Sequence, residues 1–182
     1  MGAKCCRGKE KYPHLFSPIR IGNIRMKNRI IAAPTSPSMI TTEGHFTPEM
    51  IAYLEEKALG GAGVVTYGEA IVHSATGKSH NKQLQLDSFG VKQGMAEASR
   101  AIHNAGAYAN IQLSHGGKYG GLVSIGGDQG CCETAYGPSH EMTPAGEVFE
   151  MPKELILEIV DSYRTGAKLC KDCGFDMVQV HA

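Results

Sequence analysis

The chain has 182 residues, of which 42% are hydrophobic and 20% charged, and its formal net charge is zero. This composition is typical of a folded domain with a substantial core and excludes an intrinsically disordered chain. The balanced charge argues against a surface dedicated to nucleic acid or to an anionic membrane, and no apolar run approaches the ~20 residues of a membrane-spanning helix.

The N-terminus is polar and basic over residues 1–11 and lacks the apolar segment of a secretory signal, so we expect a flexible arm there and a cytoplasmic protein. Six cysteines occur as the pairs Cys5-Cys6, Cys131-Cys132 and Cys170/Cys173. A zinc or iron–sulfur site needs further ligands at defined spacings, and the sequence contains no second C-x-x-C. We therefore favour free structural thiols over a disulfide or a metal site, and we predict no metal ligands.

The first predicted element is a hairpin over residues 14–29, in which apolar and polar residues alternate on both sides of a Gly22-Asn23 turn. An apolar run over residues 29–33 follows directly and predicts the first buried strand of the domain. This strand ends in Pro34-Thr35-Ser36. Small residues at that point leave room for a large flat group on the end of the strand.

Thr47-Pro48 begins the first predicted helix, because threonine is a good N-cap and proline suits the first helical position. The helix is expected to end at Gly60-Gly61. Its apolar residues recur at helical spacing: Met50, Ile51, Leu54 and Ala58. Residues 64–67 predict a second buried strand, which ends in Gly68-Glu69-Ala70.

A second helix is predicted over residues 92–104 and a third strand over residues 108–113, which ends in Gln112-Leu113-Ser114-His115. We expect His115 to be a structural loop residue rather than a catalyst. Residues 116–150 are rich in glycine and have no clear period, which predicts a long functional loop.

The third predicted helix runs from Pro152 to about Cys173 and precedes a fourth strand over residues 175–180, with His181 at the end of that strand. The apolar face of this helix is formed by Leu155, Ile156, Ile159, Val160 and Tyr163.

Strands that alternate with amphipathic helices predict an α/β fold with a parallel sheet and helices outside it. Open α/β sheets and (β/α)8 barrels both place their sites at the carboxyl ends of the strands, where the small and polar residues gather here. No G-x-G-x-x-G follows the first strand, which favours the TIM barrel. Since four strands are half of such a barrel, we expect residues 12–182 to be the N-terminal half of a longer TIM barrel. Alone, this half would expose sheet edges and would aggregate or pair, which leaves a homo-oligomer open.

Five motifs resemble those of the old yellow enzyme family, in the right order and spacing. They are Leu15-Phe16-Ser17-Pro18-Ile19, Lys27-Asn28-Arg29-Ile30, Ala33-Pro34-Thr35-Ser36, Ile111-Gln112-Leu113-Ser114-His115 and the segment from Gly174 to Ala182. The chain is most similar to the subgroup of NADH:flavin oxidoreductases, enoate reductases and 2,4-dienoyl-CoA reductases. The match covers nearly the whole chain from about residue 12.

The resemblance implies a (β/α)8 barrel that holds FMN at the carboxyl ends of its strands and is reduced by NAD(P)H. The reduced flavin would pass hydride to an alkene conjugated to a carbonyl group, so the partner is a small-molecule substrate. The resemblance also implies that the phosphate site of FMN lies after this half of the barrel. An iron–sulfur cluster and FAD, which the longer members carry, would likewise lie in a C-terminal part.

The resemblance assigns the flavin-binding residues to three strand ends. Ala33, Pro34, Thr35 and Ser36 match the segment beside the isoalloxazine ring, where the Ser36 hydroxyl would tune the redox potential by hydrogen bonding. Gly68 and Glu69 match the second strand end, although a glutamate departs from the commonest alanine or glycine and a shift of one residue would select Ala70. Gln112 matches the glutamine that faces the pyrimidine edge of the ring, because a carboxamide can donate and accept at once.

His181 matches a family histidine or asparagine that holds the carbonyl oxygen of the substrate. Negative charge builds on that oxygen as hydride adds to the β-carbon, so a fixed donor there lowers the barrier. Two alternatives to an ene-reductase stay open: a flavin-dependent amine dehydrogenase of the same fold, and a catalytically incomplete half-barrel that binds flavin weakly or not at all.

Overall fold

Four parallel strands form the centre of the protein. After the first, each of them lies beside the parallel strand that precedes it in the chain. The computed structural model describes residues 8–122 and 131–181. The elements in chain order are β1 (Ile19–Ile21), β2 (Ile24–Met26), β3 (Ile31–Thr35), α2 (Pro48–Leu59), β4 (Val64–Ile71), α3 (Ser74–Gly77), β5 (Leu84–Gln85), α4 (Lys92–Asn104), β6 (Tyr108–Ser114), η1 (Gly117–Gly120), β7 (Ala135–Gly137), β8 (Glu141–Thr143), β9 (Gly146–Glu150), α5 (Lys153–Asp172) and β10 (Met177–Val180).

The order of the central sheet is β10-β6-β4-β3, with the short strand β5 paired to β4. The order never reverses, so this part of the sheet contains no topological switch point of the kind that marks an open doubly wound sheet. Sequential parallel strands, each followed by a helix, are the arrangement of a (β/α)8 barrel. The prediction of a β1–β2 hairpin followed by the first four barrel strands is confirmed.

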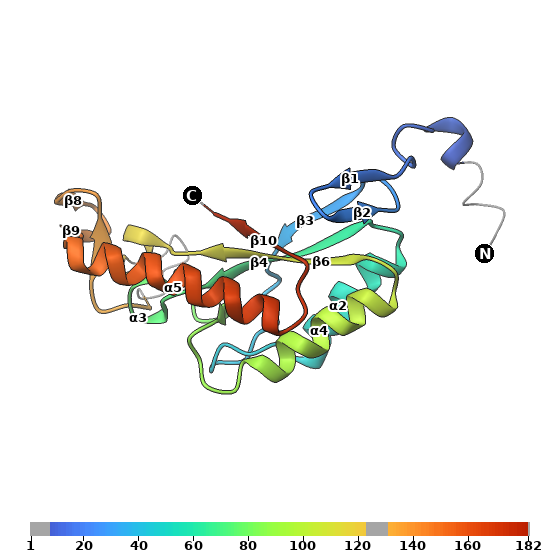
Figure 1. Cartoon of the computed structure of the whole chain (residues 1–182). Coiled ribbons are helices and arrows are strands. Elements are labelled where there is room, and N and C mark those ends of the chain that lie inside the picture. The colour runs from blue at the N-terminus through green and yellow to red at the C-terminus, as the bar shows by residue number, and fades with distance from the viewer. Residues whose placement is uncertain (1–7, 123–130, 182) are drawn as a thin grey trace.

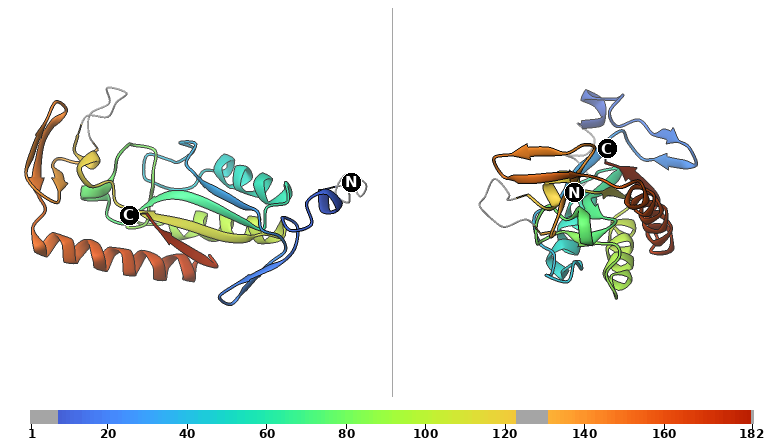
Figure 2. Two further views of the ribbon diagram at one scale, coloured as in Figure 1. Left: turned by 90° about the horizontal axis from the view of Figure 1, so that it is seen from above. Right: turned by 90° about the vertical axis from the view of Figure 1, so that its left-hand side faces the viewer.

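Helices α2, α4 and α5 lie on one side of the sheet (Figures 1 and 2). Thr47 caps α2 as predicted, because its side chain accepts a hydrogen bond from the Met50 amide and Pro48 follows at the first helical position. The core between helices and sheet consists of fully buried side chains such as Met50, Met95 and Ile111. None of the helices in the described ranges has the length and apolarity needed to cross a membrane.

The strands point toward a small second sheet, and the β1–β2 hairpin lies at the opposite end (Figure 1). In this second sheet β9 pairs in parallel with β7 and antiparallel with β8. It packs on its own small core of Leu122, Ala135 and Val148. Residues 116–150, predicted as a loop without structure, therefore contain a sheet over the carboxyl edge of the barrel strands.

Three further predictions need correction. Strand β3 is not buried, because it is an edge of the described sheet and Ile31 is 51% exposed. Strand β4 does not end at Tyr67 but continues through Gly68-Glu69 to Ile71. The fourth strand, β10, begins at Met177 rather than at residue 175, because the Phe175 amide still bonds to the Cys170 carbonyl at the end of α5.

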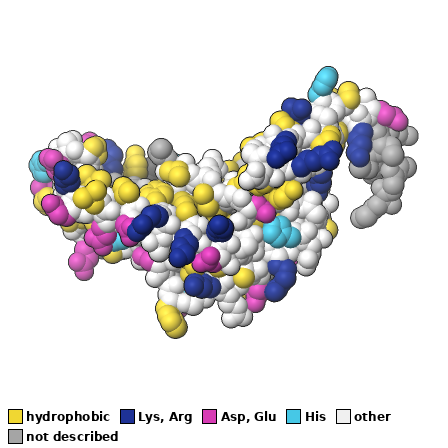
Figure 3. Space-filling view, viewed as in Figure 1, with side chains coloured by type: hydrophobic (Ala, Val, Ile, Leu, Met, Phe, Trp, Pro, Cys, Tyr) yellow, Lys and Arg dark blue, Asp and Glu magenta, His cyan; other side chains and the backbone are white. Residues whose placement is uncertain are grey.

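The apolar face of α5 is only partly covered, because Ile159 is buried while Ile156 and Val160 are exposed. Hydrophobic side chains gather over α5 and β10 in Figure 3.

The thiols of Cys170 and Cys173 are free and buried, as predicted for that pair. The predicted flexible arm over residues 1–11 lies largely outside the described residues; residues 8–11 are helical.

Asn28 joins the hairpin to the loop before β4. Its Nδ2 donates to the Gly61 carbonyl at 2.8 Å and its Oδ1 accepts from the Ile30 amide at 3.1 Å, with the side chain buried. Replacing Asn28 with alanine should lower the free energy of unfolding by about 1–3 kcal/mol, because two partly buried backbone groups lose their partner. Urea denaturation of both proteins measures this difference. A loss similar to that of an exposed change such as Arg25→Ala would contradict it.

Candidate functional site

Two irregularities in strand pairing bring three strand ends to one level of the sheet. Strand β3 pairs with β4 as Ala32↔Val65 and then Thr35↔Tyr67, so β3 carries one extra residue in the interval that includes Pro34. Strand β4 pairs with β6 as Tyr67↔Ile111 and then Ala70↔Leu113. Gly68 and Glu69 together therefore lie opposite Gln112. Bulges of this kind re-aim side chains and are frequent beside active sites.

Gly68 packs closely against both Pro34 and Gln112, and we call these three residues the strand-end cluster. A Cβ atom added at Gly68 would lie 2.6 Å from Pro34 Cβ and 2.8 Å from Gln112 Oε1. Side chains do not approach that closely, so only glycine fits between the other two residues. Gly68 thus lets the side chains of Pro34 and Gln112 lie close to each other over the backbone of β4.

Two polar groups of this region have no partner within the described part of the chain. The Ser36 Oγ atom is buried without a hydrogen bond, and so is the Tyr67 hydroxyl. Burial raises the pKa of Tyr67 to about 12, so its hydroxyl remains a donor at neutral pH. Ser36 lies close enough to lower this pKa slightly, although the two hydroxyls do not reach hydrogen-bonding geometry. An unpaired buried hydroxyl is costly, and a ligand that bonded to Ser36 would remove that cost.

The other two residues predicted for the first strand end, Ala33 and Thr35, lie at the surface of the described chain. Thr35 is exposed, and its hydroxyl donates to the Ala33 carbonyl at 3.2 Å and accepts from Lys57 Nζ at 3.2 Å. Ala33 is exposed as well. Of this segment, Pro34 contacts the strand-end cluster and Ser36 carries the unpaired hydroxyl.

Glu69 directs its side chain into a polar network rather than away from the sheet. Its Oε2 accepts a hydrogen bond from Ser114 Oγ at 2.9 Å, and its Oε1 accepts from Gln83 and from Ser79. The carboxylate is therefore occupied by protein donors. Any contact of residue 69 with a ligand on the strand ends would come from its backbone.

His181 lies on the strand next to Gln112. Strand β10 pairs with β6 as Gln179↔Gln112, and the His181 amide donates to the Leu113 carbonyl at 2.9 Å. Residues paired in parallel strands share a face, and residues two apart along a strand share it too. The backbone register thus places Gln112, Gln179 and His181 on one face, and the His181 side chain is exposed.

A chain of hydrogen bonds at the same edge was not predicted from the sequence. Thr76 Oγ1 lies 2.9 Å from His115 Nε2 and 2.8 Å from His73 Nδ1, and His73 Nε2 lies 3.3 Å from Glu158 Oε1. The Gly117 amide donates to His115 Nδ1, so the neutral ring carries its proton on Nε2 and donates to Thr76. Thr76 then donates to His73, which donates to Glu158. The partners are 39 and 85 residues apart, so no local pattern could have revealed them.

Protonation of His115 should destabilise the protein. Burial lowers the pKa of His115, and His73 lowers it further, while the Gly117 amide already occupies Nδ1. Because the folded pKa is below the unfolded value of about 6.5, the unfolded chain binds the extra proton more tightly. Stability should therefore fall as the pH drops below about 6.5. Urea midpoints at high and low pH test this: the advantage of the wild type over His115→Asn should shrink in acid, and an unchanged advantage would contradict the prediction.

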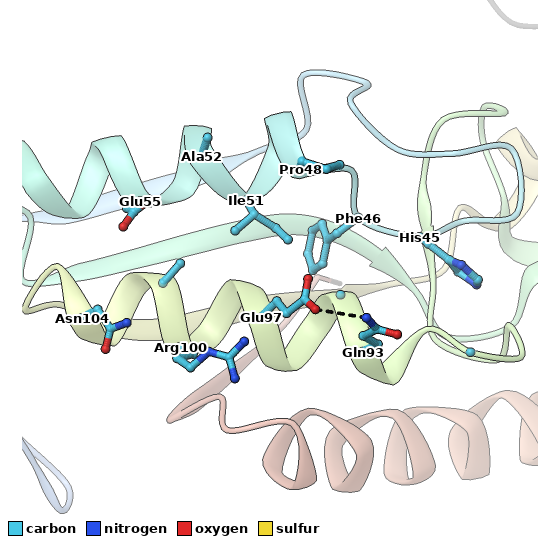
Figure 4. A pocket seen from close by; sticks show the side chains of 13 residues that line it. His45, Phe46, Pro48, Ile51, Ala52, Glu55, Gln93, Glu97, Arg100 and Asn104 are labelled. Carbon is cyan, nitrogen blue, oxygen red and sulfur yellow. Dashed lines mark hydrogen bonds between the residues drawn. The ribbon is translucent and has the colours of Figure 1, made fainter.

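A separate groove of about 620 Å³ lies between α2 and α4 on the helical side of the sheet (Figure 4). Phe46 and Ile51 line it together with polar groups such as Glu97, whose carboxylate accepts from Gln93 at 3.2 Å. None of the residues of the strand-end cluster lines this groove. Within the described ranges, no group of three or more His, Cys, Asp or Glu side chains is placed to hold a metal ion.

Comparison with known proteins identifies relatives that match nearly the whole of this chain. The model of the NADH:flavin oxidoreductase / NADH oxidase family matches residues 14–182. A cinnamate reductase of Clostridium sporogenes is 30% identical over 181 residues, which is 96% of this chain and 26% of that protein.

Two solved structures are similar in fold. A 2-naphthoyl-CoA reductase in complex with 2-naphthoyl-CoA shares 30% identity with a TM-score of 0.82, over 93% of this chain and 27% of the other. An old yellow enzyme from Pichia sp. AKU4542 has a TM-score of 0.80 at 24% identity, over 92% of this chain and 45% of the other. The chain thus spans between about a quarter and about half the length of the proteins it matches.

Proposed function

The chain belongs to the NADH:flavin oxidoreductase / NADH oxidase family, and we propose from this premise that its protein is an FMN-dependent ene-reductase. In the proposed reaction, the β-carbon of an alkene conjugated to a carbonyl would gain a hydride and the α-carbon a proton from water, with NAD(P)H as the reductant and FMN as the redox cofactor. The observation that carries the proposal is the contact of Pro34, Gly68 and Gln112 at the carboxyl ends of three adjacent strands. Such strand ends are where barrels of this architecture bind ligands.

The residues present fit a flavin. The Ser36 hydroxyl is buried without a partner among the described residues, and the Gln112 carboxamide lies nearby in the sheet with 9% of the residue exposed. A flavin carries both donors and acceptors along one edge, so it could satisfy an amide and a hydroxyl together. Only glycine at position 68 lets Pro34 and Gln112 come this close to the strand backbone. A few polar groups among apolar and small residues are what a flat, polar-edged ring requires.

Each group of this chain has a defined part in the proposed mechanism. Bound FMN would supply the two-electron chemistry. Gln112 orients the pyrimidine edge of the ring by donating and accepting hydrogen bonds, and Ser36 donates to the ring from the first strand end. His181 donates to the carbonyl oxygen of the substrate, where negative charge develops. Its exposed position on β10 leaves it accessible to a substrate lying over the strand ends.

The same proposal includes a longer barrel, of which this chain forms one half. Residues 12–182 supply the N-terminal half of an FMN-binding barrel, and further strands pair with the outer edges of β3 and β10. The support comes from those two edges, which have a strand neighbour on only one side, and from exposed apolar side chains such as Val178 and Val180. Residues 1–182 expressed alone are expected to show no NAD(P)H oxidation.

A natural substrate class is an enoate or an aryl thioester. The related cinnamate reductase and 2-naphthoyl-CoA reductase are named for substrates in which an unsaturated bond is conjugated to a carbonyl. The test uses the full-length protein: its flavin absorbance is recorded, and NADH and NADPH oxidation is followed with enones, enoates and aryl-CoA thioesters. We expect a yellow protein that reduces at least one of these classes. A full-length protein that holds no flavin would contradict the proposal, and oxidation of amines alone would favour an amine dehydrogenase.

A further inference from the structure

Glu69 carries a carboxylate directly beside the strand-end cluster. It follows Gly68 in the chain, so its Cα lies within about 4 Å of the Gly68 Cα. Its side chain is only partly exposed, and its oxygens accept hydrogen bonds from Ser114, Ser79 and Gln83. All three donors are neutral. Among the described residues Glu69 forms no ion pair, so no cation cancels its charge.

The orientation of Gln83 directs a fixed donor at this carboxylate. Gln83 is fully buried, and its Oε1 accepts from the backbone amides of Ser79 at 2.9 Å and His80 at 3.2 Å. The side-chain amide therefore cannot be flipped, and its Nε2 faces Glu69 and Ser79 Oγ. Because an amide N–H can only donate, the Glu69 Oε1 accepts from it. The network thus fixes the position of the carboxylate with neutral donors.

The charge of Glu69 acts on groups around the site. Burial raises the pKa of both Tyr67 and Tyr163, and the negative charge of Glu69 raises both further. Tyr67 lies on β4 beneath the strand ends, whereas Tyr163 lies on α5. The charge of Glu69 thus acts on groups of both β4 and α5. A charge fixed by neutral dipoles in a partly buried site is screened less than one on the surface.

We propose that Glu69 sets the reduction potential of the flavin by placing an uncompensated negative charge beside the ring. The inference rests on the proposed function and deepens it. A flavin that accepts two electrons gains negative charge, and a fixed carboxylate nearby opposes that gain. The potential is therefore lowered, and the reduced ring becomes a stronger hydride donor to an alkene. Glu69 is in this sense a tuning residue, with no contact of its carboxylate to the substrate.

The test is the midpoint potential of the flavin in the full-length protein, measured by dye equilibration for the wild type and for Glu69→Gln. Glutamine keeps the size of the side chain and removes the charge. A fixed charge near the ring in a partly buried site is expected to shift an equilibrium by about tenfold. That factor corresponds to about 30 mV for a two-electron couple, and the variant should be the more positive. Sulfite, which adds to oxidised flavin and leaves negative charge on it, should bind about tenfold more tightly to Glu69→Gln.

Two further variants keep the test decisive. Glu97→Gln makes the same chemical change on α4 in the groove of the helical side, and it should leave the potential unchanged. Ser114→Ala keeps the Glu69 charge but removes one of the dipoles that offset it, so its potential should become more negative. If all variants bind flavin and their midpoint potentials are equal, the inference about Glu69 is overturned while the proposed function stands. If Glu69→Gln fails to fold, an unchanged potential in Ser114→Ala overturns it. A wild type without flavin overturns the proposed function, and this inference with it.

Discussion

Replacing His181 with alanine is expected to lower kcat for alkene reduction by about 10²–10³. The proposed role of the imidazole is to donate a hydrogen bond to the carbonyl oxygen of the substrate, where negative charge appears only as hydride adds. Such a donor acts mainly in the transition state, so its loss reduces kcat more than it weakens substrate binding. The backbone of residue 181 should stay in place, because its amide is bonded to the Leu113 carbonyl whatever the side chain. Steady-state kinetics of the full-length protein, normalised to bound flavin, measure the effect.

His181→Asn is the matched control for this prediction. Asparagine retains a donor at the same position, and the family resemblance implies that either residue can hold the carbonyl oxygen. The asparagine variant should therefore keep much more of the wild-type kcat than the alanine variant. Full flavin content with wild-type kcat in His181→Ala would remove this residue from the proposed site.

Gly68→Ala is expected to reduce bound flavin at least tenfold. The added Cβ would lie 2.6 Å from Pro34 Cβ and 2.8 Å from Gln112 Oε1, so the proline or the carboxamide would have to move. Overpacking of this kind costs about 1–3 kcal/mol, and at this position the displaced groups are those proposed to meet the ring. Flavin absorbance per mole of protein measures retention of the ring, and circular dichroism shows whether the fold survives.

Gly60→Ala provides the control for steric change at a glycine. Gly60 ends helix α2 with a right-handed φ of −63°, away from the strand ends, and a Cβ there would approach no atom more closely than 3.3 Å. This variant should retain flavin. If Gly68→Ala folds and binds flavin as well as Gly60→Ala does, the strand-end cluster is not the ring site.

The local elements could be predicted because each carries its signal within a few residues. The Gly22-Asn23 turn, the Thr47 cap and the glycine after α5 all define boundaries that the structure reproduces. Gly174 has a φ of +88°, the left-handed conformation that ends a helix at glycine. Sequential β/α units then fix the parallel sheet without further information. The barrel class followed from these units and from the absence of nucleotide-binding glycine motifs.

The small sheet over residues 135–150 was missed although part of it carries a signal. Thr143-Pro144-Ala145-Gly146 has proline and glycine where a type I turn favours them, and it joins β8 to β9. The parallel pairing of β7 with β9 has no such local signal. Strand exposure was also mispredicted, because apolar composition alone does not show that a strand lies at the edge of a sheet.

The candidate site was predictable as a set of strand ends but not in its detail. The family resemblance selected Pro34, Gly68 and Gln112 one by one, and their close packing depends on two bulges that only strand pairing can create. The network around Glu69 joins residues that are 10, 14 and 45 positions away along the chain. Such partners meet only once the sheet has formed, so no spacing rule identifies them.

A crystal structure of the full-length protein with FMN tests the central claim most directly. We expect the isoalloxazine ring to lie against Pro34 and Gly68, with its polar edge hydrogen-bonded to the Gln112 carboxamide at about 3 Å. Density for the ring in the groove between α2 and α4, or at any position that leaves Gln112 without a bond to it, would contradict the claim.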